Sequence, residues 1–374
     1  MESFNAGQFV NQGTYSSFQP NSINRHWNLK DMELLDMLGH ADRLIGKLDM
    51  YSKYIPNIDL FIEMHVTTEA TLSSKIEGTR TNIDDAIFEK SRVAEHKRDD
   101  WQEVQNYMTA LNAAIKQLNT LPFSSRLIRD THKSLLQGVR GEMKLPGEFR
   151  TSQNWIGGVN INDATFVPPI HSDVHTYMSD IEHFVHNSSV HFPELLKIAL
   201  IHYQFETIHP FLDGNGRIGR LMIPLYLMEK NILHQPILYL SKFLEKNRML
   251  YYDALMRVRL QNDITSWFKF FLRGIIETTE SGIETFDKIL QLEKSVKQKA
   301  LSFGSRAENA LAIIIALFKK PVIDAKKVAL ITGLSMPSVY TLLDDLEKAQ
   351  IIQEATGAKR NKLYIFDDYI ELFR

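Results

Sequence analysis

The residues best suited to chemistry lie between positions 209 and 220, where the sequence reads His-Pro-Phe-Leu-Asp-Gly-Asn-Gly-Arg-Ile-Gly-Arg. A glycine-rich turn that leads into a helix presents free backbone N–H groups and the positive end of the helix dipole, so it attracts anions. Arg217 and Arg220 lie three residues apart, can face the same way on that helix, and suit phosphate oxygens. Asp213 offers the hard oxygen that phosphate-bound Mg²⁺ prefers, and His209 is a candidate general base. The stretch therefore predicts a polyphosphate site with a base beside it.

The flanking sequence places this stretch on a loop between two buried helices. Residues 195–208 are almost entirely apolar, a run too long for a strand, and residues 221–228 resume the apolar pattern. Each fragment alone has an ordinary explanation, because glycines form turns, a histidine beside an apolar helix is often structural, and surface arginines pair with carboxylates. The complete string is far more specific than its parts.

At every fixed position the string resembles the signature of the Fic family, His-Pro-Phe-x-(Asp or Glu)-Gly-Asn-Gly-Arg-x-x-Arg. The resemblance implies an enzyme that uses ATP and moves its AMP part onto a Ser, Thr or Tyr hydroxyl of a protein. It implies that His209 takes the proton of the hydroxyl and that Asp213 holds Mg²⁺, with Mn²⁺ as an alternative. The glycine turn and Arg217 would hold phosphates, and Arg220 would orient the γ-phosphate. The residues implied to contact the nucleotide are Glu77, His209, Gly214, Asn215, Gly216, Arg217, Ile218, Gly219, Arg220 and Tyr251.

A second motif ends an earlier predicted helix. Ser73 and Glu77 are four residues apart and therefore share a face, and Gly78 suits the left-handed position after a helix. A carboxylate is unfavourable at the negative end of a helix dipole, so Glu77 needs a cationic partner unless it is simply solvated. The segment resembles the family's autoinhibitory motif, (Ser or Thr)-x-x-x-Glu-(Gly or Asn). The resemblance assigns inhibition to Ser73, Glu77 and Gly78, with Glu77 paired to Arg220.

Glycines, prolines and aromatic residues with short apolar runs between positions 144 and 169 predict a β-hairpin among helices. A connecting loop with a small core of its own is the alternative. In the resemblance this segment is the flap that positions the target backbone by strand addition beside residues 154–158. Three further histidines, His183, His186 and His191, lack a metal-ligand spacing and are interpreted as surface or capping residues.

The composition is that of a globular chain with a sizeable core. The 374 residues carry a formal net charge of −2 and are 44% hydrophobic, which predicts no general attraction to nucleic acid or anionic membrane. The absence of cysteine excludes disulfides and thiol catalysis and suits a reducing compartment. With neither a membrane-length apolar run nor a signal-peptide pattern, we expect a cytoplasmic protein without a membrane partner.

The chain is predicted to be mainly α, with a Fic-type helical core, a β-hairpin flap and a small C-terminal winged-helix (α+β) domain. Residues 1–24 read as an extended or poorly ordered arm. The predicted parts are an N-terminal arm and helical region with the inhibitory motif, the catalytic core, a helical connector and the winged-helix domain, at residues 1–110, 111–280, 281–304 and 305–374. The helices predicted before the signature span residues 27–45, 60–76, 82–98, 101–118, 127–137, 174–185 and 195–208.

The C-terminal domain raises the question of DNA binding. Residues 325–349 predict a helix-turn-helix, followed by two strands around a loop that contains Gly357. The second helix is acidic, and the basic cluster of the wing is limited to Lys359, Arg360 and Lys362. This pattern favours a packing or partner-docking role over DNA binding, although a nucleotide-sensing DNA-binding regulator stays an alternative. Removal of AMP from a modified protein is a second alternative, and the target protein, self-modification and a homodimer are left open.

Overall fold

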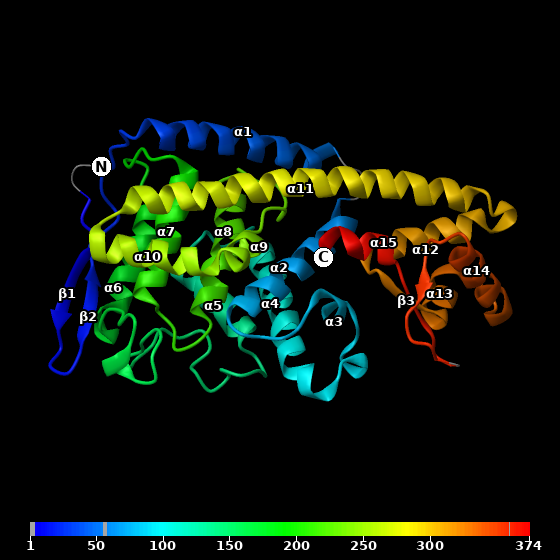
Figure 1. The fold of residues 1–374 in the computed structure, drawn as a ribbon, viewed down its shortest axis with the longest axis horizontal. Coiled ribbons are helices and arrows are strands. Elements are labelled where there is room, and N and C mark those ends of the chain that lie inside the picture. The colour runs from blue at the N-terminus through cyan, green and yellow to red at the C-terminus, as the bar shows by residue number, and fades with distance from the viewer. Residues whose placement is uncertain (1–3, 55–57, 359) are drawn as a thin grey trace.

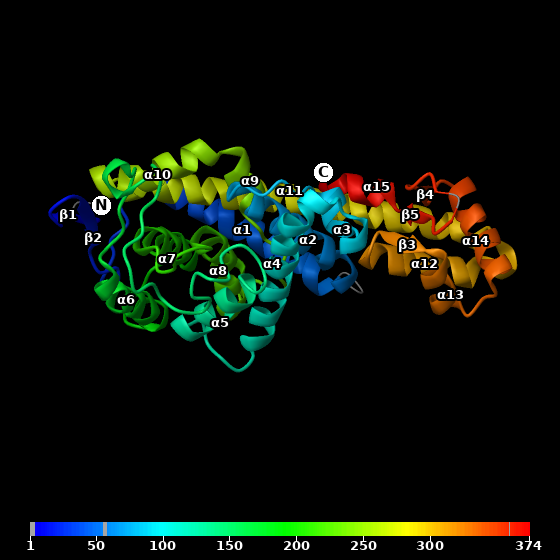
Figure 2. The same ribbon diagram turned by 90° about the horizontal axis from the view of Figure 1, so that it is seen from below.

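A long helix organises the molecule along its longest axis. The computed structural model describes residues 4–54, 58–358 and 360–374 and is mainly helical, as predicted. The 38-residue helix α11 (Ile264–Leu301) runs from the signature-bearing core at one end to the C-terminal elements at the other, as Figures 1 and 2 show from two sides. The predicted boundary at residues 280/281 falls inside this unbroken helix.

The core helices have the following bounds. They are α1 (Met32–Tyr54), α2 (Asp59–Ile76), α3 (Ile83–Ile87), α4 (Arg98–Gln117), α5 (Ser125–Leu135), α6 (Val174–His186), α7 (Glu194–Ile208), α8 (Asn215–Glu229), α9 (Ser241–Lys246) and α10 (Arg248–Gln261). Short 3-10 turns at Lys90–Arg92, Glu95–Lys97, Ile161–Asp163, His171–Asp173 and Gly304–Arg306 connect some of them. The short helix α9 has no counterpart among the predicted elements.

The helices that flank the signature are the most buried in the core. Every residue of α7 from Leu195 to Ile208 is buried, including the polar side chains of Lys197, His202 and Glu206. The indole of Trp267 on α11 donates a 2.8 Å hydrogen bond to the carbonyl of Ala199, which fixes α11 against α7. The signature loop, residues 209–214, is therefore held between two buried helices.

Capping residues account for several helix boundaries. The carboxylate of Asp31 accepts from the N–H of Leu34, so α1 begins at residue 32 rather than at 27. Asn82 caps α3 in the same way, through the N–H of Asp85. The continuous helix predicted for residues 82–98 is wrong, because α3 ends at Ile87 and two 3-10 turns follow in a charged stretch without an apolar face.

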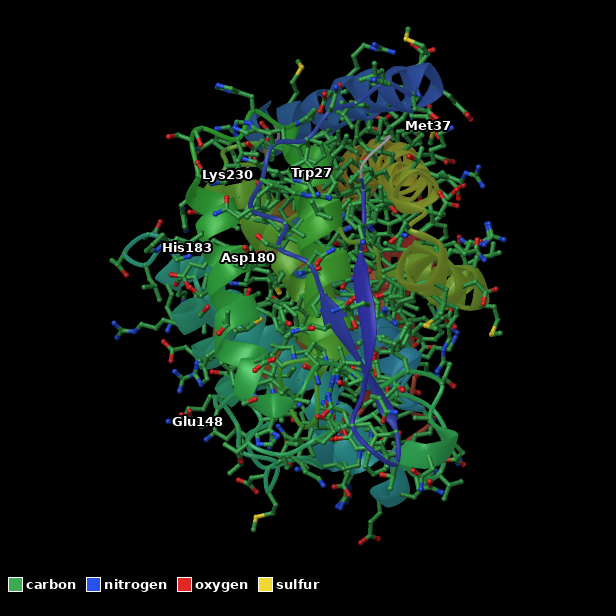
Figure 3. The ribbon with its side chains drawn as sticks, turned by 90° about the vertical axis from the view of Figure 1, so that its left-hand side faces the viewer. Trp27, Met37, Glu148, Asp180, His183 and Lys230 are labelled. Carbon is green, nitrogen blue, oxygen red and sulfur yellow. The ribbon has the colours of Figure 1, made fainter. Side chains whose placement is uncertain are left out.

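The N-terminal segment is predicted to be an extended or poorly ordered arm; residues 4–24 are ordered, and their two strands are extended. Strands β1 (Gly7–Asn11) and β2 (Ser16–Pro20) form an antiparallel hairpin. Phe18 is fully buried, and its N–H donates to the carbonyl of Val167 at 2.9 Å. Figure 3 shows the hairpin lying against the core, with Asp180 beside the segment that follows β2; Asp180 accepts from the N–H of Ile23 at 2.8 Å.

The predicted flap hairpin is present only in a reduced form. Ile156 and Phe166 form one antiparallel bridge, with N–H···O distances of 2.8 and 3.1 Å between their backbones. A 3-10 turn closes the loop between them. Because β2 donates to Val167, the hairpin of the N-terminal segment covers the Phe166 side of this loop, and the Ile156 side faces away from it.

The C-terminal elements follow the order predicted for a winged helix, with one strand that the sequence analysis did not include. They are α12 (Ala307–Lys319), β3 (Val322–Asp324), α13 (Ala325–Thr332), α14 (Met336–Lys348), β4 (Gln353–Glu354), β5 (Leu363–Ile365), α15 (Asp367–Ile370) and a final 3-10 turn, η6 (Glu371–Phe373). The antiparallel sheet has the order β3-β5-β4. Phe318 on α12 packs edge-on against Phe61 on α2, with ring centroids 5.4 Å apart. Lys359, part of the predicted basic cluster, lies outside the described residues.

Across the described ranges, the structure contains no helix that is both long enough and apolar enough to cross a membrane.

Candidate active site

The signature loop is held by two residues in the left-handed backbone conformation. His209 ends α7 with φ of +49°, and its N–H still bonds to the carbonyl of Phe205 at 2.8 Å. Gly214 precedes α8 with φ of +75°, a conformation that favours glycine. The chain reverses between these points, so the first turn of α8 lies beside the end of α7.

Two asparagines orient the imidazole of His209. The amide groups of Asn154 and Asn215 lie 3.0 and 3.1 Å from Nδ1. Asn215 is itself fixed, because its Oδ1 accepts from the N–H of Phe211 at 2.8 Å. Nε2 makes no hydrogen bond within the described part of the chain. Burial, helped by the charge of Arg150, lowers the pKa of His209 to about 3, so the ring is neutral near pH 7.

His132, which the sequence analysis did not single out, supports the loop from below. Its ring stacks on Phe211 with centroids 3.7 Å apart, and Nδ1 accepts from the N–H of Gly147 at 2.8 Å. Nε2 therefore carries the proton and donates to the carbonyl of Asp213 at 3.0 Å. Burial lowers the pKa of His132 to about 4, which keeps it neutral. Its position on the apolar face of α5 predicts from the sequence that His132 is buried, but it does not predict the hydrogen bond to Asp213.

The two carboxylate oxygens of Asp213 have different surroundings. Oδ1 accepts from the N–H of Gly214 at 2.6 Å and lies 3.4 Å from Nη2 of Arg217. Oδ2 faces the backbone of Gly141, where a side chain would come within 3.0 Å of it. The described residues contain no cluster of three or more acidic or histidine side chains that could hold a metal alone. A single carboxylate oxygen fits Mg²⁺ only when substrate phosphates supply further ligands, which is the usual arrangement for this ion.

Arg217 does not lie free to meet a phosphate. Its Nη1 donates to Oε2 of Glu103 on α4 at 2.8 Å, and the two side chains are 1% and 3% exposed. The pair joins α8 to α4. In this state the predicted phosphate contact of Arg217 is not available, because a buried carboxylate already occupies its guanidinium.

Arg220 is bound by the end of α2, as the resemblance implies. Its Nη2 donates to Oε1 of Glu77 at 2.8 Å and to the carbonyl of Ser73 at 2.9 Å, and its Nε donates to Oγ of Ser73 at 2.8 Å. Burial alone would raise the pKa of Glu77, but the charge and hydrogen bond of Arg220 outweigh it and lower that pKa. Gly78 follows with φ of +100°, the conformation predicted for a residue after a helix.

Gly216 is what allows Glu77 to approach. A β-carbon at this position would lie 2.2 Å from Oε1 of Glu77 and 2.9 Å from Nη1 of Arg220. The carboxylate therefore occupies space directly over the first turn of α8. Any anion bound to the N–H groups of this turn competes with Glu77 for the same place.

A further carboxyl group, missed in the sequence, lies under α8. Oε1 of Glu206 is buried without a hydrogen-bond partner in the described structure, and a side chain at Gly219 would come within 2.3 Å of it. Burial raises the pKa of Glu206 to about 7, although the charge of Arg220 opposes this. Ile218 points into the core and is 1% exposed, so it supports α8 from inside.

Tyr251 lies deeper than predicted. It is 1% exposed, and its hydroxyl lies 2.9 Å from Nε2 of His202, whose Nδ1 lies 2.9 Å from the carbonyl of Gly219. Its neighbour Tyr252 is 37% exposed. The structure thus places Tyr251 in a chain of contacts that supports α8, and its contact with a nucleotide stays a prediction.

Arg150 connects the flap to the signature loop. Its guanidinium is buried and donates to the backbone carbonyls of His209 at 3.0 Å, Ile208 at 3.3 Å and Pro169. Its own N–H donates to the carbonyl of Pro210 at 2.8 Å. One side chain therefore fixes the base of the flap against the residue that carries the candidate base.

The three other histidines have local roles. His183 Nδ1 lies 2.7 Å from the carbonyl of Ser179 within α6, and His186 Nε2 lies 2.8 Å from the carbonyl of Phe123. His191 is exposed, in the segment that precedes α7.

Comparison with known families matches two consecutive parts of the chain. Residues 35–116 match the Fic/DOC family N-terminal domain, and residues 122–227 match the Fic/DOC family domain that carries the signature. These parts include both the Ser73–Gly78 motif and the complete signature loop.

Curated relatives from insects share the name protein adenylyltransferase Fic. The one from Drosophila virilis is 29% identical over 189 residues, which cover 48% of this chain and 34% of the relative. The one from Drosophila persimilis is 26% identical over 233 residues, covering 60% of this chain and 41% of the relative. The chain thus spans well under half the length of these relatives.

Solved structures show the same fold. A Fic family protein from Desulfovibrio desulfuricans aligns with a TM-score of 0.58 and 19% identity, over 91% of this chain and 98% of its own. Fic-1 from C. elegans aligns with a TM-score of 0.51 and 20% identity, over 69% of this chain and 73% of its own. The family matches over residues 35–116 and 122–227, which include the Ser73–Gly78 motif and the signature, show that the chain belongs to the Fic/DOC family.

Proposed function

We propose that this protein transfers AMP from ATP to a Ser, Thr or Tyr hydroxyl of a target protein and of itself, and that Glu77 holds it inhibited. The observation that carries the proposal is the set of hydrogen bonds from Arg220 to Glu77 and Ser73. An arginine guanidinium near the N-terminal end of a helix suits phosphate oxygens, and here the carboxylate of Glu77 takes their place. The name shared by the curated relatives supports the same activity.

The proposed reaction uses the residues as they are placed. Once Glu77 leaves, the N–H groups of the first turn of α8 and the fork of Arg220 hold the β- and γ-phosphates. The target hydroxyl attacks the α-phosphorus, the bond from that phosphorus to the α–β bridging oxygen breaks, and diphosphate leaves. Nε2 of His209 takes the proton of the hydroxyl. The protein contributes mainly position and charge.

Asp213 and Arg217 support this chemistry in different ways. Oδ2 of Asp213 would hold Mg²⁺, or Mn²⁺ in its place, which neutralises charge on the phosphates when it is bound. We assign Arg217 a positioning role. Its pairing with Glu103 fixes α8 and places Nη2 of Arg217 beside Oδ1 of Asp213. This assignment replaces the direct phosphate contact expected from the sequence.

We also propose that the chain divides into the four predicted parts. The C-terminal part, residues 305–374, then binds a protein rather than DNA. The exposed side of α14 carries Asp344 and Glu347, which would repel a phosphate backbone. The lack of cysteine agrees with a cytoplasmic location. Retarded migration of duplex DNA by the full chain at physiological salt would contradict the docking assignment.

The test compares two labels in one experiment. The Glu77→Gly chain is incubated with cell lysate and with ATP labelled at either the α- or the γ-phosphate, and the same chain carrying His209→Ala serves as the control. We expect α-label above that of the control and γ-label equal to that of the control, since kinases of the lysate label both samples. An excess of γ-label over the control would identify phosphate transfer instead, and equal α-labelling of the control would exclude an enzymatic reaction at this loop.

A further inference from the structure

A cavity of about 280 Å³ lies beside α2. Its walls come from α2, α9, α11 and the C-terminal turn η6, which meet where Figure 1 places the C-terminus beside α2 and α9. We call it the α2–α11 cavity. It shares no residue with the signature loop, so it is separate from the site described above.

Two residues that line the cavity each have a buried polar atom with no hydrogen-bond partner in the described structure. The hydroxyl of Tyr239 makes no hydrogen bond although the residue is only 8% exposed, and Nε2 of His65 is likewise buried and unbonded. Buried polar groups are nearly always satisfied, because an unmade hydrogen bond costs free energy. Two such atoms on one cavity therefore indicate that something polar completes them.

The lining also indicates the chemistry of the occupant. Leu72, Phe243 and Phe373 supply apolar walls, while the exposed side chains of Lys242 and Lys246 stand at the rim without an ion pair among the described residues. One exposed carboxylate, Glu277, faces them from α11. At the rim two ammonium groups face one carboxylate, and the hydroxyl of Tyr239 can donate, so the rim suits the anionic head of a small molecule with an apolar body.

The acidic residue at the base of the cavity is already satisfied. Oε1 of Glu69 accepts from the hydroxyls of Ser241 at 2.6 Å and Tyr107 at 2.9 Å, and Oε2 accepts from the N–H of Ser241 at 3.2 Å. Glu69 therefore fixes α2 to the start of α9 and does not compete for the occupant. A ligand that contacts Lys242 and Tyr239 would lie directly against this junction.

The same helix connects the cavity to the proposed inhibitory contact. His65, Glu69 and Leu72 of α2 face the cavity, and Ser73 and Glu77 of α2 bind Arg220. The cavity exists in this form while Glu77 is paired. A ligand that binds one of two conformations shifts the population toward it.

We propose that the α2–α11 cavity binds a small organic anion, with a carboxylate or phosphate head on an apolar body, and that binding holds α2 in its inhibitory position. The binding site stands on the cavity alone, whereas its inhibitory effect rests on the proposed function. The two parts are therefore tested separately.

The binding test uses 8-anilino-1-naphthalenesulfonate, an anion with an apolar body, as the probe for the full chain. Saturable binding by the parent is expected, followed by fluorescence and calorimetry. Ser281→Trp should exclude the probe by filling the cavity from α11, and Lys242→Glu with Lys246→Glu should weaken it about tenfold or more. The control pair Lys294→Glu with Lys326→Glu changes the net charge equally at exposed lysines outside the lining and should bind like the parent.

Thermal unfolding of each variant establishes that it is folded. Equal binding by the parent and both cavity variants, or no saturable binding by the parent, would overturn the site. Competition by octanoate and by phenyl phosphate then distinguishes a carboxylate head from a phosphate head, since the better competitor displaces the probe at lower concentration.

The regulatory test measures label from α-labelled ATP with and without the probe. The probe should lower incorporation by the parent several-fold and leave Glu77→Gly unchanged, because that variant no longer depends on the position of α2. Equal inhibition of both would show that the probe blocks the nucleotide site and would overturn the regulatory part. Absence of label in every chain would contradict the proposed function while leaving the binding result intact.

Discussion

The guanidinium of Arg220 donates a 2.8 Å hydrogen bond to the carboxylate of Glu77, 143 residues earlier in the chain. Ser73, one turn before Glu77, takes two more hydrogen bonds from the same guanidinium. Nη2 and Nε of the guanidinium are therefore engaged by one helix end, and neither is free for a γ-phosphate in this state.

Replacement of Glu77 by Gly should raise adenylyl transfer to targets and to the protein itself. The competitor leaves and Arg220 is freed, so we expect a gain of about 10- to 100-fold, the usual range for coupling between two sites. Arg220→Ala should show no gain, because it loses the phosphate contact, and the double variant should stay inactive. Incorporation from α-labelled ATP measures all four chains. A double variant as active as Glu77→Gly would show that Arg220 is not the residue being controlled.

His209→Ala should lose transfer by about 10² to 10⁴-fold, the usual contribution of a general base. ATP binding should persist, because the phosphates are held by other groups. Calorimetric titration with ATP and single-turnover labelling separate the two effects, and both are best measured in the Glu77→Gly background. Unchanged labelling by His209→Ala would remove this residue from the mechanism.

Removal of divalent metal should abolish transfer by Glu77→Gly, and so should Asp213→Asn in that background. Asparagine keeps an oxygen that can accept from Gly214 but lacks the charge that a phosphate-bound cation needs, so the loop should stay folded. Activity restored by Mg²⁺ or Mn²⁺ in the parent loop, but not in the variant, is the expected result. Full activity in excess chelator would contradict a metal at Asp213.

Ile156→Pro should weaken transfer to protein targets without weakening ATP binding. The N–H of Ile156 donates to Phe166 across the loop, so proline removes one of the two hydrogen bonds that form the bridge. This differs from the simplest flap picture, in which that N–H would meet the target. Phe166→Ala is the matched control, because it keeps the backbone bridge. Normal labelling of targets by Ile156→Pro would show that the backbone bridge is not needed for target binding.

Glu206→Gln should stabilise the fold at high pH and not at low pH. The folded-state pKa of about 7 lies above the ordinary glutamate pKa of 4.5, so the native state binds the extra proton and loses stability as pH rises from 4.5 through 7. Glutamine avoids that loss, and we expect a gain of about 1 to 3 kcal/mol at pH 8 that fades toward pH 5. Chemical denaturation at both pH values measures it. An equal effect at the two values would mean that Glu206 does not titrate as described.

Local sequence patterns predicted the parts of the site that depend on spacing. The position of Glu77 at a helix end predicted a cationic partner, the family resemblance implied that it is Arg220, and the structure places Arg220 there. Patterns could not reveal Glu103, whose burial depends on Arg217 lying 114 residues further along the chain. The same limit explains Tyr251, because spacing showed a helical aromatic residue but not the contact with His202 that places it under α8.

The N-terminal hairpin shows a different limit. Its polar composition suggested an arm, yet Phe18 alone supplies a fully buried anchor, and its backbone partner Val167 belongs to a distant segment. For the charged stretch after Ile87, the sequence predicted more order than the structure has. Its residues favour helix, but without an apolar face to bury they do not continue the helix.

The N-terminal hairpin also constrains the order in which the chain can assemble during synthesis. The N–H of Ala6 bonds to the side chain of Asn262 at 2.7 Å, across 256 residues of sequence. Ala6 therefore cannot reach its final place until Asn262, 256 residues later, has been made. Because long-range contacts form late and slowly, docking of the hairpin is a late step of folding, and it covers the Phe166 side of the flap only after α7 and α8 have been made.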